Sequence, residues 1–269
     1  MDIRTFTVRR YLPGDVPEMT RLWQEAFGDS EHFISIFYKL LPSMGFAVVA
    51  EYGGQITAAA HMITGMEYVD KQGARTPCAY LYAVSVKKEM RGMGMGKAVV
   101  RAAAEMAKAG GCIVCTSPAD KSLYGWYRRL IGTEHELNRA IFTVPAAGAP
   151  GCPSVSSAEY NRIRSRLLAG RPHMELSDTV MHFHALLCLE YGGGLFGTEN
   201  GIAAVTREGG TAVLSECLSP DPAALAAAVA GTLGAGQAQY SVPVADKGSP
   251  YLALDAAVDP ETVWNICFD

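Results

Sequence analysis

The chain has 269 residues, an apolar fraction of 49% and a formal net charge of -4, with a pI near 5.9. This length and composition support one large globular domain or two ordinary ones, each with a real core. The acidic surplus argues against a nucleic-acid-binding protein, because such proteins carry excess basic charge for the phosphates. A small-molecule or protein partner is expected instead.

The sequence shows no targeting or membrane segment. The N-terminal stretch MDIRTFTVRRYLPGD lacks the apolar run of about 7 to 15 residues that a signal peptide needs. The most apolar stretch, AALAAAVAGTLGAG from Ala223, is shorter than the roughly 20 residues that span a bilayer. We therefore expect a cytoplasmic protein without a transmembrane helix.

The cysteines and histidines do not predict a disulfide framework or a metal site. Seven scattered cysteines are expected to be small buried apolar residues. Cys112 and Cys115 lie three apart on a predicted strand, where their side chains point to opposite faces. His182 and His184 lie two apart on a predicted helix and face different directions, so no zinc site is expected.

The first half predicts two helices followed by an antiparallel meander. Apolar residues recur at helical spacing over 18–27 and 30–41, with Asp29 or Ser30 available as a cap. After Pro42, the stretches FAVVAEY, ITAAAHMITGMEYV and CAYLYAVSV read as three strands, the first two joined by a turn at Gly53 and Gly54.

A glycine-rich loop follows the third strand. The sequence SVKKEMRGMGMGKAVV, from Ser85, leads into a helix that ends at Gly110 and Gly111. The strand CIVCTS, the helix SLYGWYRRLIG and the strand ELNRAIFTV come next. The stretch PAAGAPGCP, from Pro145, has linker composition and predicts a domain boundary.

The second half predicts the same order of elements. It has helices over 158–169 and 177–191, three strands (GLFGT, GIAAVTR, TAVLSECL), a helix over 222–233 and the strand QYSVPV. We therefore predict domains at 1–145 and 154–269, joined by a linker at 146–153, with the second domain an internal structural repeat of the first. At the position of the glycine loop the second half reads LSPDPAA, without glycine.

A glycine-rich turn that opens a helix exposes backbone N–H groups at the positive end of the helix dipole, and this arrangement binds phosphate. A P-loop is excluded, because Arg91 stands where its first glycine belongs and Ala98 follows Lys97. A G-x-G-x-x-G dinucleotide fingerprint is excluded as well, because Gly92 and Gly94 would require glycine at position 97.

The pattern Arg91-x-x-Gly94-x-Gly96 resembles the R/Q-x-x-G-x-G/A motif with which GNAT N-acetyltransferases hold the pyrophosphate of acetyl coenzyme A. A second stretch, SPADKSLYGWYRRLIGT, resembles the family's N-x-x-A-x-x-F/Y-Y-x-K-x-G-F helix, with Asp120 in place of asparagine and Gly132 shifted by one residue. The resemblance covers about residues 1–145. It implies an α/β (α+β) fold with a mixed, largely antiparallel sheet, followed by a smaller α/β domain that lacks the pyrophosphate loop.

The resemblance also implies site residues. The strand end and the loop would hold acetyl coenzyme A through Val84, Ser85, Val86, Arg91, Gly92, Met93, Gly94, Met95, Gly96 and Lys97. A contact from Asp120 to the pantetheine arm is the weakest of these implications. Tyr127 matches the family's proton donor, and Tyr124 lies one turn earlier on the same side of the helix. Candidates for the base are Glu51, His61, Glu67 and Tyr82, with no motif to choose among them.

The implied activity is transfer of an acetyl group from acetyl coenzyme A to a primary amine of a small molecule or peptide, by direct attack. The alternative is a coenzyme A-binding sensor or scaffold without catalysis. The second half is expected either to border the acceptor cleft or to form a homodimer surface. The chain end NICFD is a further candidate for reaching the site.

Overall fold

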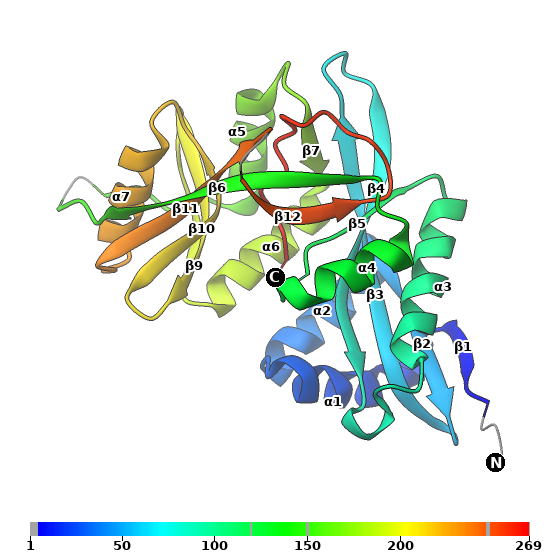
Figure 1. Ribbon diagram of the computed structural model, residues 1–269. Helices are drawn as coiled ribbons and strands as arrows, with labels where there is room; N and C mark the ends of the chain where they lie inside the picture. Colours follow the sequence, from blue (N-terminus) through cyan, green and yellow to red (C-terminus); the bar gives the residue numbers. More distant parts are fainter. Residues whose placement is uncertain (1–4, 119, 149–150, 246–247, 269) are drawn as a thin grey trace. The chain divides into compact units, whose positions relative to one another are not determined.

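The first part of the chain forms helices followed by an antiparallel sheet, as predicted. The computed structural model describes residues 5–118, 120–148, 151–245 and 248–268. Its first elements are β1 (Thr7–Arg10), η1 (Pro13–Asp15), α1 (Val16–Phe27), α2 (Glu31–Met44), β2 (Gly45–Tyr52), β3 (Gln55–Val69) and β4 (Arg75–Val86) (Figure 1). They are followed by η2 (Lys88–Met90), α3 (Met95–Ala109), β5 (Ile113–Thr116), η3 (Lys121–Leu123) and α4 (Tyr124–Ile131).

The second part repeats the order of helices, meander, helix and strand. Its elements are β6 (His135–Pro145), α5 (Ser157–Leu168), β7 (His173–Leu176), α6 (Asp178–Glu190), β8 (Gly194–Thr198), β9 (Gly201–Glu208), β10 (Thr211–Leu218), α7 (Pro222–Thr232), β11 (Gln237–Val244) and β12 (Ser249–Leu254). The α/β class with a mixed sheet is confirmed, since β4 and β5 are parallel whereas β2 and β3 are antiparallel.

The chain divides into two compact units, each described here by itself. Unit 1 consists of Met1–Met66, Thr76–His135 and Ala253–Ala257, and unit 2 consists of Glu67–Arg75, Glu136–Leu252 and Val258–Asp269. Neither unit is one continuous block. Their limits therefore differ from the domains 1–145 and 154–269 and from the linker 146–153 expected from composition.

Two strands account for this difference. In unit 1 the neighbour of β5 is the end of β12, where Ala253 pairs with Thr116 and Leu254 with Cys115. In unit 2 the neighbour of β11 is β6, which pairs antiparallel with it from Asn138 to Pro145. In each unit, therefore, the second strand of the parallel pair (β5 or β11) is paired on its other side with a strand from the other half of the chain. Linker composition marks flexible stretches but carries no information about which edge a strand joins.

Capping residues explain the helix limits. Ser30 Oγ accepts a hydrogen bond from Phe33 N at 3.1 Å and so caps α2, whereas Asp29 accepts from Trp23 Nε1 at 2.6 Å. The helix α2 continues through Pro42 to Met44, beyond the predicted end, because a proline in the last turn removes a single backbone hydrogen bond. Among the described residues, no helix combines the length and apolarity needed to cross a bilayer.

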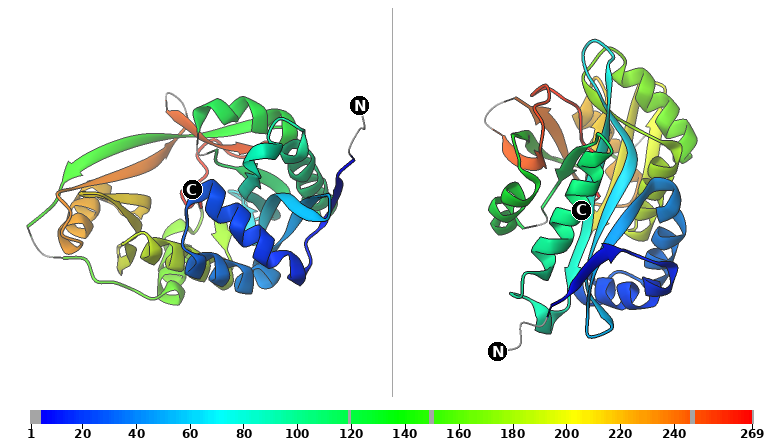
Figure 2. Two further views of the ribbon diagram at one scale, coloured as in Figure 1. Left: turned by 90° about the horizontal axis from the view of Figure 1, so that it is seen from below. Right: turned by 90° about the vertical axis from the view of Figure 1, so that its right-hand side faces the viewer.

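Unit 1 has helices on both faces of its sheet. Alternate residues of β2 and β3, including Val48, Ala58 and Ala60, form one core cluster with the inward face of α3. The residues between them face the opposite side, where His61 contacts Trp23 of α1 and Phe37 of α2, with ring centroids 5.0 Å and 5.3 Å apart. Figure 2 shows α3 and the α1–α2 pair on opposite sides of these strands.

Unit 2 has a comparable arrangement. The strands β8, β9 and β10 are antiparallel, and β11 returns parallel to β10 after α7. Ala226, Val229 and Ala230 of α7 pack on alternate residues of β9 and β10. All seven cysteines of the chain are free, and six of them are buried, as expected; Cys112 is half-buried.

Candidate active site

The glycine loop ends at the N-terminus of α3, and its backbone geometry depends on glycine. Gly92 and Gly94 have φ of +81° and +85°, in the left-handed region that side chains disfavour. Gly94 is the N-cap of α3, and the first intrahelical bond runs from Ala98 N to Gly94 O at 3.0 Å. The N–H groups of Met95, Gly96 and Lys97 therefore precede the intrahelical ladder, at the positive end of the helix dipole.

Gly96 is required for a different reason, which is close approach. A Cβ at this position would lie 3.0 Å from Val86 Cγ2 and 3.9 Å from the Trp126 ring. The end of β4, the first turn of α3 and α4 thus meet around a residue without a side chain. This contact brings together three of the segments that the sequence assigned to the site.

The side chains of the loop separate into outward-facing and inward-facing ones. Arg91, Met93 and Lys97 are exposed, and Arg91 Nε donates to Val86 O at 3.3 Å. Met95 is buried and its sulfur accepts a hydrogen bond from Thr57 Oγ1 at 3.2 Å. Met95 can therefore contribute only its backbone N–H to an anion.

The strand β4 separates from β5 just before the loop. Their parallel pairing covers Cys78–Tyr80, and the last contact runs from Thr116 Oγ1 to Leu81 O at 3.1 Å. β5 ends at Thr116, whereas β4 continues to Val86. The main chain of Val84–Val86 therefore lies beyond the described pairing with β5, at the position where a ligand would pair with β4.

A distorted residue lies inside this segment. Ala79 and Leu81 face the cluster with α3, and so do Val84 and Val86, so the alternation of side chains slips by one residue between the two pairs. Ala83 has φ of +44° and is the one non-glycine residue with positive φ among those described. Such a conformation costs about 1–3 kcal/mol and is typical of functional sites.

Ser85 follows the distortion and carries a buried hydroxyl. Its side chain is 2% exposed, and Ser85 Oγ has no hydrogen-bond partner among the described residues. A buried hydroxyl without a partner costs about 1–3 kcal/mol. Val84 and Val86 face the α3 cluster, so the Ser85 side chain lies on the opposite face of β4.

The helix α4 brings two tyrosines to the same core cluster. Tyr124, Trp126 and Tyr127 are partly buried against it, and the rings of Trp126 and Tyr127 meet edge to face with centroids 4.7 Å apart. Burial raises the pKa of Tyr127 to about 12. Tyr127 is therefore protonated at neutral pH, as an ordinary tyrosine is, and burial makes its hydroxyl a weaker acid than that of an ordinary tyrosine.

Comparison with known families matches this region. Residues 7–130 match the family model described as "Acetyltransferase (GNAT) domain". This part of the chain is a GNAT acetyltransferase domain. The family consists of acyltransferases that use acetyl coenzyme A as co-substrate. The family predicted from the sequence is thereby confirmed.

Several solved structures share the fold over most of the chain. A protein of Enterococcus faecalis described as a probable N-acyltransferase is 17% identical with a TM-score of 0.68, over 93% of this chain and 72% of that chain. A GCN5-related N-acetyltransferase of Kribbella flavida is 17% identical with a TM-score of 0.67, over 93% and 70%. Eis1 of Mycobacterium abscessus is 13% identical with a TM-score of 0.62, over 93% and 74%. No curated protein sequence matches this chain.

The GNAT domain has a cradle that fits acetyl coenzyme A. The N–H groups at the start of α3 suit its pyrophosphate, the close packing of Gly96 on Val86 keeps this helix terminus beside the end of β4, and the Ser85 hydroxyl has no hydrogen-bond partner among the described residues. Asp120 fits less well, because its Oδ1 accepts a hydrogen bond from Ser122 N at 2.7 Å. This bond is the main cause of the lowered pKa of Asp120, and it gives the carboxylate a local structural role.

Three of the four candidate bases are held in structural ion pairs or hydrogen bonds, and the fourth, Tyr82, packs against two aromatic rings. Glu51 pairs with Arg9 at 3.0 Å, and Glu67 pairs with Arg75 at 2.7 Å. His61 is buried with both ring nitrogens in hydrogen bonds, and burial lowers its pKa to about 4. We assign the base to none of these three.

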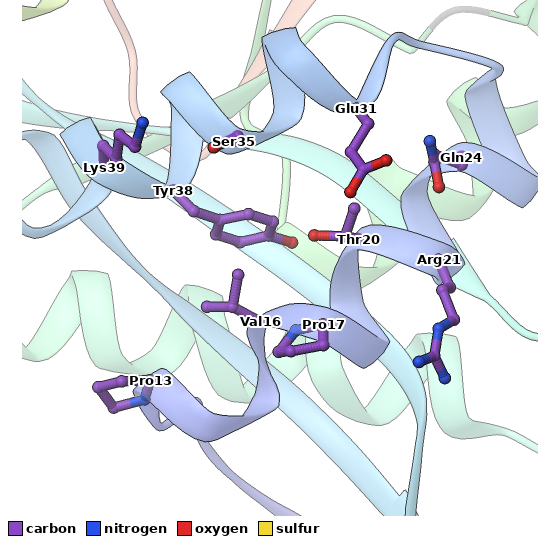
Figure 3. Close-up of a pocket in the computed structure, with 10 residues that line it drawn as sticks. All are labelled: Pro13, Val16, Pro17, Thr20, Arg21, Gln24, Glu31, Ser35, Tyr38 and Lys39. Carbon is purple, nitrogen blue, oxygen red and sulfur yellow. The ribbon is translucent and has the colours of Figure 1, made fainter.

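A polar groove of about 690 Å³ lies between α1 and α2, apart from the cradle. Its ten lining residues include Arg21, Glu31, Tyr38 and Lys39, and none belongs to the glycine loop or to α4 (Figure 3). Figure 3 shows the Tyr38 side chain lying between the two helices, with its hydroxyl toward Thr20.

Unit 2 has no counterpart of the cradle at the start of α7. Asp221 caps this helix, since its Oδ1 accepts from Ala224 N at 3.0 Å, and Pro222 provides no N–H. A carboxylate at the helix N-terminus repels phosphate and occupies the donor that phosphate would use. This geometry explains why a pyrophosphate site is not expected in the second half.

Proposed function

We propose that the protein is an acetyl-coenzyme A-dependent N-acetyltransferase that acetylates a primary amine of a small molecule or peptide. The observation that carries the proposal is the contact between the end of β4, the start of α3 and α4 around Gly96. This contact supports the proposal, because it joins a helix N-terminus suited to phosphate to α4, the helix that carries Tyr127. Because Asp221 closes the corresponding terminus of α7, we assign the co-substrate to unit 1 alone.

The chain's own groups have separate roles in this proposal. The N–H groups of Met95, Gly96 and Lys97 bind the pyrophosphate, with Arg91 and Lys97 adding positive charge. The main chain of Val84–Val86 pairs with the pantetheine arm, and an N–H of this segment polarises the thioester carbonyl. Both functions use the main chain of Val84–Val86, which lies beyond the described pairing of β4 with β5.

Tyr127 supplies the proton for the leaving thiolate. The neutral amine forms the new C–N bond, the C–S bond breaks, and the sulfur takes the phenolic proton, which Tyr127 regains from the acetylated nitrogen through solvent. Tyr127 carries this proton at neutral pH, and since burial raises its pKa to about 12, it gives up the proton only as the C–S bond breaks and the thiolate forms. Tyr124, one turn away, is the alternative donor.

A thiol-release assay with acetyl coenzyme A and a panel of primary amines tests the proposal. We expect thiol release that depends on an amine and falls sharply in Tyr127→Phe. Tight binding of acetyl coenzyme A without thiol release from any amine would instead support a coenzyme A-binding sensor or scaffold. Unchanged turnover in Tyr127→Phe, with loss in Tyr124→Phe, would move the proton donor to Tyr124.

A further inference from the structure

His61 forms two side-chain hydrogen bonds inside unit 1. Its Nδ1 lies 3.1 Å from Ala83 O, and its Nε2 lies 3.1 Å from the Tyr38 hydroxyl. A carbonyl oxygen can only accept, so Nδ1 carries the hydrogen, and in a neutral ring Nε2 then accepts from Tyr38. The two bonds fix both the tautomer and the orientation of the ring.

The surroundings of His61 hold the ring in place. His61 is 1% exposed, and Tyr38 is 7% exposed. The rings of Trp23, Phe37 and Tyr38 lie with centroids 5.0–5.7 Å from the imidazole. Burial keeps the imidazole neutral at physiological pH by lowering its pKa to about 4, so the donor at Nδ1 is permanent under these conditions.

The partner of His61 is the distorted residue of β4. A hydrogen bond from Lys87 N to Thr57 O joins β3 to the end of β4. Because the strands are antiparallel, counting four residues forward from Thr57 and four back from Lys87 puts His61 opposite Ala83. The residue whose carbonyl His61 binds is thus the residue at which side-chain alternation slips, with φ of +44°.

We propose that His61 is a positioning residue that holds Ala83 in its left-handed conformation and thereby aims the main chain of Val84–Val86 at acetyl coenzyme A. This inference rests on the proposed function of that segment. His61 touches neither reactant; it acts through the carbonyl of Ala83. Without the bond, β4 can relax toward regular alternation, which turns the following N–H groups away from the cradle.

Two substitutions separate positioning from simple core packing. His61→Asn keeps an amide donor near the place of Nδ1, whereas His61→Gln puts its amide near the place of Nε2 and loses the bond to Ala83. We expect His61→Gln to lower kcat on the order of 100-fold, as for a misplaced reacting group, and His61→Asn to stay within about fivefold of the wild type. Thiol release from acetyl coenzyme A with spermidine or a lysine peptide provides the readout. Equal losses in the two variants would overturn the proposal.

A glycine at position 83 provides a second test, because it asks whether the loss caused by His61→Gln depends on the conformation of Ala83. Glycine adopts positive φ without strain. In Ala83→Gly, residue 83 therefore needs much less stabilisation from the hydrogen bond of His61. We expect the loss caused by His61→Gln to be about tenfold smaller in the Ala83→Gly background, a coupling typical of residues in contact. The same loss in both backgrounds would contradict the proposed role.

Binding and spectroscopic measurements on the full chain keep this claim separate from the activity itself. If the wild type binds acetyl coenzyme A but releases no thiol, the transferase proposal fails, while the His61 claim still predicts weaker binding in His61→Gln than in His61→Asn by about tenfold.

Long-range proton–nitrogen NMR spectra should show a neutral ring protonated at Nδ1. The amide signals of Val84–Val86 should shift in His61→Gln and stay in place in His61→Asn. A ring protonated at Nε2, or equal amide shifts in both variants, would refute the claim.

Discussion

Replacing Gly94 with alanine tests whether the glycine loop is the binding cradle. Gly94 has φ of +85°, and a Cβ there meets no atom within 4 Å. The substitution therefore adds backbone strain without a steric clash, at a cost of about 1–2 kcal/mol. We expect the loop to relax in Gly94→Ala, so that binding must restore the strained conformation and the Kd for acetyl coenzyme A rises about 5- to 30-fold.

The chain offers a matched control for this change. Gly73, in the turn between β3 and β4, has φ of +83° and equally open space around a Cβ. Gly73→Ala adds the same strain outside the cradle, so it should lower the free energy of unfolding while leaving the Kd unchanged. Calorimetric titration with acetyl coenzyme A and urea denaturation of both variants give the comparison. Equal Kd values in the two variants would refute the assignment of the loop.

Three further predictions address the proton donor, the buried histidine and the strand from the chain end. Tyr127→Phe should lower kcat about 10²- to 10⁴-fold, measured as thiol release, with the Kd for acetyl coenzyme A unchanged; a loss confined to binding would contradict the role. His61 has a pKa of about 4 in the fold against about 6.5 when unfolded. Because the unfolded chain binds the extra proton between these values, the free energy of unfolding should fall by up to about 3 kcal/mol as the pH drops from about 6.5 to about 4. Urea denaturation should show this loss reduced in His61→Asn, and an identical pH slope in that variant would count against it. Asp255 accepts a hydrogen bond from Val114 N at 2.6 Å, so Asp255→Ala should destabilise the protein by about 1–3 kcal/mol, whereas Asp259→Ala, which removes a partly exposed ion pair with Lys71 and an exposed hydrogen bond from Glu261 N, should cost less, about 1 kcal/mol. Equal midpoints for these two variants would argue against a structural role for the end of β12.

The elements and the loop could be predicted because their signals are local. The cap at Ser30, the glycines after α3 and the apolar run in β2 each act within a few residues, and the predicted strands at 194–198 and 211–218 match β8 and β10. The glycines at 92 and 94 indicated a special backbone, and both have positive φ. The strands β1, β7 and β12 were missed, whereas the equally short β5 and β8 each follow a pair of glycines that marks a turn.

The exchange of β6 and β12 between the units could not be predicted, because strand pairing depends on contacts between residues far apart in the chain. The β5 edge is paired by Ala253 and Leu254, more than a hundred residues away in sequence. Ala83 is a similar case, since alanine has no preference for positive φ. Its conformation follows from tertiary contacts such as the bond from His61.

A crystal structure with coenzyme A bound is the most direct test of the account. We predict pyrophosphate oxygens within hydrogen-bond distance of the N–H groups of Met95–Lys97. We also predict a pantetheine arm along the main chain of Val84–Val86, with its sulfur closer to the Tyr127 hydroxyl than to that of Tyr124. Coenzyme A bound at the start of α7, or bound in unit 1 away from the α3 terminus, would contradict the central claim.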